Sequence, residues 1–367
     1  MTEDRVALDD WYPVADAVPA GQGPAGRGPA DAFTTRLLGH PLRVAFAGGR
    51  ARITALRGDG HELRELPVTE RFGLVWTTLG RPAKEVYDLP EAHEAGRRYV
   101  RCGWVTLRTS APRIVENFLD MAHFPFVHPG VLGSEPWTEV ADYEAEIRRD
   151  VDEVWATNCK FFQPRVAVTE SGGAYASLTY RVPSPFQVML YRVCPTAPER
   201  LDAILLAVHP VDEHLCRAQP VEYLVDDDSS DNALLSFEQA IFLQDRFIVE
   251  NQRPLSLPLS PGEEIPVRAD NASMTYRRWL REKKLKFGVI ALPPVLSAHP
   301  PSRGFLKSGM TEVGEVPCPR LQESRSGVKA TGPDIREGGG AFRLASADAS
   351  RPKSGSSEAR SSLGRSA

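Results

Sequence analysis

The sequence predicts an α+β protein in which a small β-rich region precedes a curved antiparallel sheet wrapped on a long helix. Short segments of alternating apolar and polar residues, separated by Gly, Pro and Asp, dominate residues 8–80. Similar segments recur between residues 99 and 225, and one long helical stretch follows at residues 231–251. This order of elements is typical of a sheet packed on a helix.

Composition limits the classes of function. The chain has 367 residues, 42% hydrophobic and 25% charged, enough for one large domain or two ordinary ones. A formal net charge of −4 gives no electrostatic footprint for nucleic acid. The basic run at residues 277–284 is expected to be a solvated helix face, and a binding patch is the less favoured interpretation.

The N-terminus carries no apolar stretch of the signal-peptide type, and no run is long enough to span a bilayer. We therefore expect a cytoplasmic protein with no membrane partner. The five cysteines are scattered and never form a Cys-x-x-Cys pair, which favours reduced, mostly buried thiols over a zinc site or a disulfide framework.

Three regions are expected along the chain: a β domain over residues 1–95, a catalytic domain over residues 96–292 and a disordered tail over residues 293–367. Within the first, residues 42–46 and 72–76 are predicted strands. Residues 19–30 are rich in Gly, Pro and Ala and indicate a flexible loop. In the tail, hydrophobic periodicity disappears and Ser, Gly, Arg and Pro dominate.

The second region begins with a strand at residues 99–109, followed by Ser110 as a helix cap and Pro112 in the first turn. A helix is predicted over residues 111–123. Later strands are expected at residues 153–157, 175–182, 187–193, 201–208 and 217–225. A further helix, capped at residues 229–231, should run to about residue 251.

Two histidines stand out in this region. Asn117, Asp120 and His123 recur every three residues, so a helix would place them on one face. Pro125 should then end the helix, and His128 would return from an irregular turn. Such a bend can bring both imidazoles to one metal, although two histidines five residues apart are more often ordinary core or surface residues.

Asp245 lies between Ile241 and Ile248 at spacings that predict an inward-facing apolar stripe, where an unpaired charge is costly. A bound cation would offset that cost, and so would a salt bridge to Arg246 or Arg253. Two imidazoles and one carboxylate can occupy one face of a ferrous ion and leave the opposite positions open for dioxygen and substrate.

Several segments together resemble the oxygenase component of the Rieske non-haem iron oxygenases, in the vanillate-demethylase-like branch. They are Asp10-Trp11-Tyr12-Pro13-Val14, Asp120-x-x-His123-x-x-x-x-His128-Pro129-Gly130, Gln244-Asp245 with Glu250-x-Gln252-Arg253-Pro254, and Tyr276-Arg277-Arg278-Trp279-Leu280. The resemblance covers residues 8–288. It implies that residues 1–95 form a degenerate Rieske-like domain and that the catalytic domain has a helix-grip fold.

The resemblance also implies roles for particular residues. His123, His128 and Asp245 would ligate Fe(2+), and Asp120 would be the catalytic carboxylate that links a ligand histidine to the electron-donating cluster of a neighbouring subunit. Metal-bound histidines usually donate their free ring N–H to a carboxylate, which suits Asp120. Asn117 is a weaker candidate for the same surrounding layer.

One family feature is missing. Family members bind a [2Fe-2S] cluster through Cys-x-His and a later Cys-x-x-His in the N-terminal domain, but no cysteine precedes Cys102 here. The histidines of that stretch are His40, His61 and His93, and His61 is expected to be an exposed turn residue. We expect no [2Fe-2S] cluster in this chain. A Rieske-containing reductase or other cluster-bearing subunit would supply electrons, with NAD(P)H used only indirectly.

The resemblance implies that Fe(2+) and O2 hydroxylate a methyl group of an aromatic or heteroaromatic compound, giving N- or O-demethylation with release of formaldehyde. An aromatic ring hydroxylase and a non-catalytic binding or stabilising subunit are the alternatives. A trimer or hetero-oligomer is expected. Little positive charge near the site favours a neutral substrate over an aromatic carboxylate. The apolar candidates for the substrate pocket are Phe161, Phe162, Phe186, Met189, Phe242 and Phe247.

Overall fold

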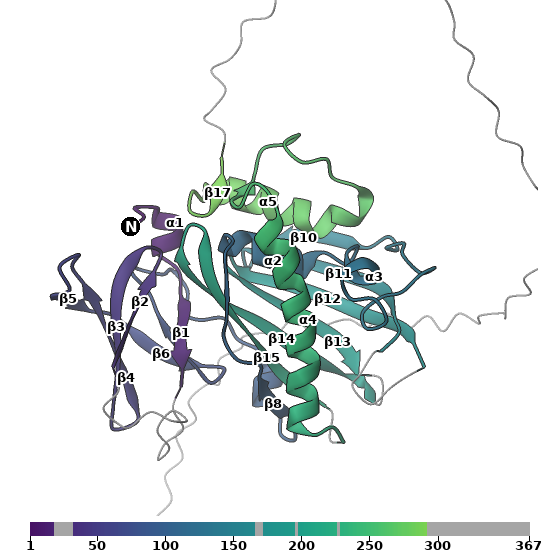
Figure 1. Ribbon diagram of the computed structural model, residues 1–367, viewed down its shortest axis with the longest axis horizontal. Coiled ribbons are helices and arrows are strands. Elements are labelled where there is room, and N and C mark those ends of the chain that lie inside the picture. The colour runs from purple at the N-terminus through teal and green to yellow at the C-terminus, as the bar shows by residue number, and fades with distance from the viewer. Residues whose placement is uncertain (18–31, 166–171, 195–196, 226–227, 292–367) are drawn as a thin grey trace, which may run out of the picture. The chain divides into compact units, whose positions relative to one another are not determined.

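The computed structural model describes residues 1–17, 32–165, 172–194, 197–225 and 228–291. The loop predicted at residues 19–30 and the tail predicted at residues 293–367 lie outside the described residues. The described chain has the expected α+β order, with strands first and then a large antiparallel sheet that carries helices (Figure 1). None of its described helices combines the length and hydropathy that a bilayer crossing requires.

The N-terminal region contains a short helix, α1 (Arg5–Leu8), and two antiparallel sheets with strand orders β1-β7-β6 and β2-β3-β4-β5. Their strands are β1 (Tyr12–Asp16), β2 (Phe33–Leu37), β3 (His40–Ala47), β4 (Arg50–Leu56), β5 (Glu62–Glu65), β6 (Val68–Arg71) and β7 (Leu74–Thr77). Gly48 and Gly49 join β3 to β4 with φ of 56° and 77°. A two-residue hairpin turn needs such positive angles, which glycine adopts at little cost.

Strands β4 and β5 are joined by a tight turn. The N–H of Arg57 donates to the carbonyl of His61 (2.8 Å), and the N–H of Gly60 donates to the carbonyl of Arg57 (2.9 Å). His61 is exposed, as the sequence predicted for a turn residue.

The large sheet contains eight strands, in the order β10-β11-β12-β13-β14-β15-β8, with β9 also paired to β15. All of these pairs are antiparallel. The strands are β8 (Arg98–Arg101), β9 (Val105–Leu107), β10 (Glu144–Arg148), β11 (Glu153–Gln163), β12 (Ala174–Ser184), β13 (Gln187–Cys194), β14 (Ala197–Asp212) and β15 (Leu215–Leu224). The five later strands expected from the sequence correspond to β11–β15.

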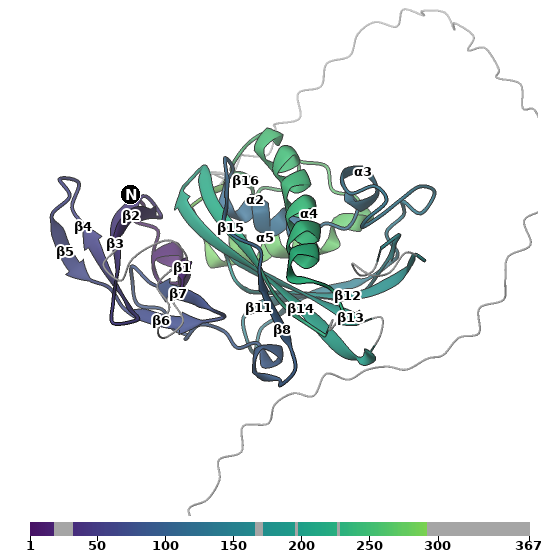
Figure 2. The ribbon, with the colours of Figure 1, turned by 60° about the horizontal axis from the view of Figure 1, so that its bottom comes forward.

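Helices α2 (Ala111–Leu119) and α4 (Asp231–Asn251) lie on one face of this sheet (Figures 1 and 2). Ser230 begins α4 as expected, because its hydroxyl accepts a hydrogen bond from the N–H of Ala233 (3.2 Å). Helix α2 contacts both the sheet, at β13 and β14, and the helices α4 and α5. The remaining elements are η1 (Pro90–His93), α3 (Phe124–Val127), β16 (Leu257–Pro258), η2 (Arg268–Asp270), α5 (Asn271–Lys283) and β17 (Val289–Ile290).

Hydrogen bonds join the N-terminal region to the rest. The carboxylate of Asp4 accepts from the backbone N–H of Lys286 (2.7 Å) and Phe287 (3.0 Å). The N–H of Leu38 donates to the carbonyl of Pro210 (2.8 Å). The described residues therefore belong to one compact unit, and its division near residue 95 stays a prediction.

His209 on β14 is fully buried at this junction, where its Nε2–H donates to the carbonyl of Arg36 (2.6 Å). Burial lowers the pKa of His209 to about 4, and Arg217 acts in the same direction, although the Arg36 carbonyl opposes them. The unfolded chain binds this proton near pH 6.5, so the unfolded state gains stability as the pH falls from 6.5 towards 4. We expect this residue alone to lower the free energy of unfolding by about 3 kcal/mol across that window.

Urea denaturation of the parent and of His209→Gln at several pH values measures this effect, because Gln keeps an N–H donor but does not titrate. The difference between the two free energies of unfolding should change through the window. A difference that is the same at each pH would contradict the assignment.

Candidate metal centre

Helix α2 ends at Leu119, earlier than the sequence predicted. Asp120 has extended backbone, and its Oδ1 accepts a hydrogen bond from the N–H of Ala122 (2.7 Å). Such a local side-chain bond competes with continuation of a helix. The prediction that Asn117, Asp120 and His123 share one helical face is therefore wrong, and a turn sets the direction of His123.

The two histidines flank the short helix α3. His123 immediately precedes it and His128 immediately follows it, with the N–H of His128 donating to the carbonyl of Phe124 (3.0 Å). Pro125 lies in the first turn of α3 and so begins a helix. The sequence had predicted instead that Pro125 would end the helix expected over residues 111–123. The turn between the two histidines brings their ring centroids to 5.1 Å.

Asp245 reaches this pair from α4. Its Oδ1 lies 3.2 Å from Nε2 of His123 and 3.1 Å from Nε2 of His128. The two Nε2 atoms are 3.2 Å apart. The side chains of His123, His128 and Asp245 are only 12%, 1% and 14% exposed. Three potential ligand atoms, one from each residue, therefore lie close together in a largely buried place.

The alternative partners of Asp245 are engaged elsewhere. Arg246 pairs with Glu250 (3.2 Å), and the guanidinium of Arg253 donates to backbone carbonyls. Ile248 is about half exposed, so the apolar stripe predicted around Asp245 is not inward-facing along its whole length. The salt bridge that the sequence left open for Asp245 is absent among the described residues, and both imidazoles take its place.

Each imidazole is held by a second hydrogen bond. Nδ1 of His123 lies 3.2 Å from Oδ2 of Asp120, and Nδ1 of His128 lies 2.8 Å from Oε1 of Gln244. Both oxygens are acceptors, so each Nδ1 carries a proton, and a neutral ring in this arrangement has the lone pair of its Nε2 free for a cation. Gln244 belongs to the Gln244-Asp245 motif, but the sequence did not predict that it orients His128. Its place directly before Asp245 is the only signal that the sequence offers.

Charge also favours a cation at this place. Burial alone would raise the pKa of Asp245, but the two imidazoles hold it below its usual range. Burial would lower the pKa of His123, but hydrogen bonds to Asp120 and Asp245 raise it to about 9. With both imidazoles neutral, the two carboxylates leave an uncompensated negative charge, which is costly in a buried site. A divalent cation would remove that cost, and two nitrogen donors with one oxygen donor suit ferrous iron.

A small cavity of about 80 Å³ borders the three residues. Its apolar wall consists of Phe118, Phe124, Leu132, Leu178, Leu190, Ile204, Phe237 and Ile241. Its polar lining includes Asn117, Gln163, Tyr180, Arg192 and Glu238. The wall is thus mainly apolar, with a few polar groups at separate points, as is usual for a small-molecule site.

None of the six apolar residues predicted for the substrate pocket lines this cavity. Phe161, Phe186, Met189 and Phe242 are core residues, Phe162 stacks on Trp137, and Phe247 is 73% exposed. The rotation of α4 explains the difference on that helix. With Asp245 directed inward, the residues four and seven positions earlier face the cavity and Phe247, two positions later, points to solvent.

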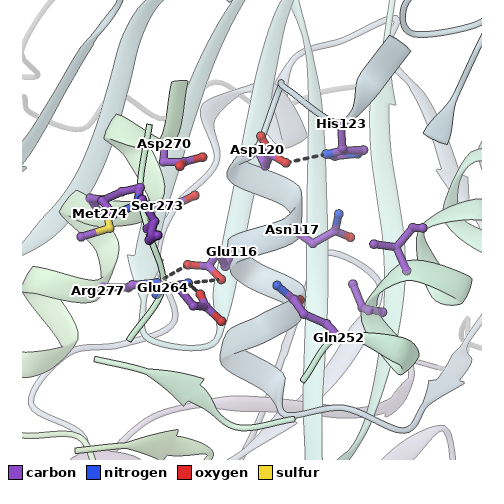
Figure 3. Close-up of a pocket in the computed structure, with 14 residues that line it drawn as sticks. Glu116, Asn117, Asp120, His123, Gln252, Glu264, Asp270, Ser273, Met274 and Arg277 are labelled. Atoms are coloured by element: carbon purple, nitrogen blue, oxygen red, sulfur yellow. Dashed lines mark hydrogen bonds and ion pairs between the residues drawn. The ribbon is translucent and has the colours of Figure 1, made fainter. Parts of the chain in front are cut away.

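A second cavity, of about 200 Å³, also borders Asp120 and His123 (Figure 3). Figure 3 shows Asp120 bonded to His123 at one side of it and Glu116 bonded to Arg277 at another. Ile265 belongs to its lining and is 92% exposed, so this cavity reaches the surface. Asp120 therefore stands between a candidate ligand and a region open to solvent.

A buried ion-pair cluster fixes α2 beside this cavity. Glu116 pairs with Arg113 (3.1 Å) and with Arg277 of α5 (2.5 Å), and Glu264 pairs with Arg113 (2.6 Å) and also with Arg277. Arg277 is buried, so the expectation that residues 277–284 form a solvated face is wrong at that position.

Comparisons with known proteins agree with this architecture. Residues 107–285 match the family model of the vanillate O-demethylase oxygenase C-terminal domain. The probable methylxanthine N7-demethylase NdmC of Pseudomonas sp. (strain TJI-51) is 40% identical over 286 residues, which is 78% of this chain and 98% of that protein. The methylxanthine N1-demethylase NdmA of Pseudomonas putida is 27% identical, and the matched part is 59% of each chain.

Solved structures show the same fold. NdmA of Pseudomonas putida CBB5 superposes with a TM-score of 0.57 at 22% identity, covering 76% of this chain and 90% of that chain. Dicamba monooxygenase bound to dicamba gives a TM-score of 0.54 at 16% identity, covering 75% and 97%. The predicted α+β arrangement of a small β region and a sheet on a helix is confirmed.

The ion-pair cluster generates a prediction about stability. Glu116→Ala leaves Arg113 and Arg277 buried with one remaining carboxylate, so the free energy of unfolding should fall by about 3 kcal/mol in urea denaturation. Glu282→Ala is the matched control, because it also removes a paired carboxylate. Glu282 lies on α5 and pairs with Arg149 at the surface. An equal, small effect of both substitutions would show that the cluster does not stabilise the fold.

The three-residue group generates a prediction about metal binding. We expect the parent to bind a single ferrous ion per chain under anaerobic titration calorimetry, and Asp245→Ala to lose that binding. Asp120→Asn keeps an acceptor for the N–H of Ala122 but removes a charge beside His123, so affinity should fall about 10- to 100-fold. Asp231→Ala is the control, because Asp231 is exposed at the start of α4, the helix that carries Asp245. This variant should bind iron like the parent. Undiminished affinity in Asp245→Ala would refute the site.

Proposed function

This chain belongs to the methylxanthine N-demethylase-like branch of the Rieske-type oxygenases, and from that membership we propose that it is the oxygenase subunit of an N-demethylating system. It is accordingly an oxidoreductase of the monooxygenase and demethylase class. The proposal extends to its iron, its substrate and its source of electrons, each of which depends on particular residues.

His123, His128 and Asp245 would hold Fe(2+) on one side and leave its other positions free. Ferrous iron bound there supplies dioxygen activation, so that a methyl carbon is hydroxylated and released as formaldehyde while two external electrons and two protons reduce the second oxygen atom to water. Asp120 would accept from Nδ1–H of His123 and Gln244 from Nδ1–H of His128, so that Nε2 of each ring faces the iron. Asn117 donates to Oδ1 of Asp245 (3.3 Å) and restrains that carboxylate.

The small cavity beside the three residues is the proposed substrate site. Its apolar wall excludes water and suits a flat ring, and its few polar groups would orient that ring. The relatives named as methylxanthine demethylases support an N-methylated heteroaromatic substrate. We therefore propose demethylation at nitrogen as the reaction, in place of O-demethylation or ring hydroxylation.

Electrons would come from another protein, because no cysteine precedes Cys102 and a Rieske cluster needs two cysteines and two histidines. We propose a Rieske-containing reductase or other cluster-bearing subunit as donor, itself reduced by NAD(P)H, within a trimer or hetero-oligomer. Asp120 supports this role, since it contacts His123 and also lines the cavity that reaches the surface.

The meeting of Asp245 with two imidazoles at 3.1–3.2 Å is the observation that carries the proposal. The three side chains come from separate segments, and two further residues orient the rings. A non-catalytic stabilising subunit would need none of these contacts.

Peroxide can replace dioxygen and electrons together, so the proposal is testable without the partner. The chain is loaded with Fe(2+) anaerobically, then mixed with hydrogen peroxide and a panel of methylated purines and methoxybenzoates. We expect formaldehyde from the N-methylated purines with the parent and with Asp231→Ala, and none with His123→Ala.

Other outcomes separate the alternatives. Formaldehyde from methoxybenzoates alone would indicate O-demethylation, and a hydroxylated ring without formaldehyde would indicate a ring hydroxylase. Iron that binds fully but yields no product from any compound would favour the non-catalytic subunit and overturn the proposal.

A further inference from the structure

Two side chains in the wall of the proposed substrate cavity each carry a buried polar atom that has no hydrogen-bond partner among the described residues. Gln163 is 3% exposed and Tyr180 is 1% exposed. Oε1 of Gln163 and the hydroxyl of Tyr180 are both buried, and neither accepts nor donates a hydrogen bond within the described residues. Buried polar atoms are nearly always paired, so two unpaired ones in one cavity need an explanation.

Their positions suit two separate edges of a bound molecule. Gln163 is the last residue of β11 and pairs in register with Ala174, whereas Tyr180 on β12 pairs with Ala156. The two side chains therefore enter the cavity from well-separated points of the sheet. The cavity between them also borders His123, His128 and Asp245.

Chemistry distinguishes the two groups. A glutamine oxygen only accepts, so it needs an N–H or O–H from a ligand, whereas a phenol hydroxyl can also donate, which suits a carbonyl or a ring nitrogen. The cation in the cavity wall, Arg192, is paired with Asp202 (3.0 Å). An anionic substrate would therefore find its counter-charge already taken, and a neutral one is favoured.

We propose that Gln163 and Tyr180 determine which methylated heterocycle this site accepts, with Gln163 accepting from a free ring N–H and Tyr180 donating to a ring carbonyl. The inference rests on the proposed function for the location of the substrate. It selects a neutral heterocycle that still carries an unsubstituted ring N–H besides the methyl group to be removed. A fully N-methylated analogue leaves Oε1 of Gln163 unpaired and adds a methyl group against it.

Binding measured by calorimetry tests the inference without turnover. The probes are two N-methylated purine diones, one with a free ring N–H and one fully methylated, added to the iron-loaded chain without dioxygen. The parent should bind the first about tenfold or more tightly than the second, because a buried acceptor left unpaired is costly. Gln163→Leu should abolish this preference, and Tyr180→Phe should weaken both probes about tenfold.

Tyr175→Phe is the matched control, because Tyr175 lies on the same strand but is 64% exposed. It should leave both affinities unchanged. Neither test substitution removes a hydrogen bond that the described part of the chain makes, so thermal unfolding of Tyr180→Phe and Gln163→Leu should occur at or above the temperature of the parent. A clear drop would show that these groups are structural and would overturn the inference.

The outcomes also separate this inference from the proposed function. A parent that binds both probes equally, or a preference that survives in Gln163→Leu, overturns the inference even if formaldehyde is produced. The predicted discrimination in binding without any formaldehyde from peroxide-driven reactions sustains the inference and removes the demethylase proposal instead.

Discussion

Negative charge held in a buried place is the constraint around which this structure is arranged. Asp120 and Asp245 lie on opposite sides of the His123 imidazole, and the exposure of Asp245 is only 14%. Carboxylates in such surroundings require compensation. A proton on the His123 imidazole, whose pKa is raised to about 9, provides it in the chain alone, and a divalent cation bound at the same place would provide it more fully. The choice of side chains and the affinity for a metal thus have the same physical origin.

This arrangement needs elements that are far apart in the sequence to stay in register. Helix α2 carries Asn117 and precedes the turn of Asp120, and the ion pair of Glu116 with Arg277 holds it against α5. Helix α4 places Asp245 and Gln244 together, so one helix provides a potential ligand and the group that orients another. An error of one residue in the rotation of α4 would separate both from the histidines.

Sequence reasoning reached the architecture and the three residues that meet, because period-two strands, a capped long helix and the His-Pro motif are local signals. It failed where the outcome depends on competition or rotation. The hydrogen bond from the N–H of Ala122 to Asp120 ends α2, and Pro125 lies in the first turn of α3, whereas it had been expected to end the preceding helix. The cavity wall was missed because helical phase, set by packing, decides that Phe237 faces inward and Phe247 faces solvent.

The N-terminal region also contributes to the stability of the larger sheet. It satisfies polar groups of the larger sheet and of the segment after α5, through the N–H of Leu38, the carbonyl of Arg36 and the carboxylate of Asp4. Removing it would leave buried donors and acceptors unpaired, including Nε2 of His209, and each such group costs about 1–3 kcal/mol. The fold therefore requires this region for structural reasons alone.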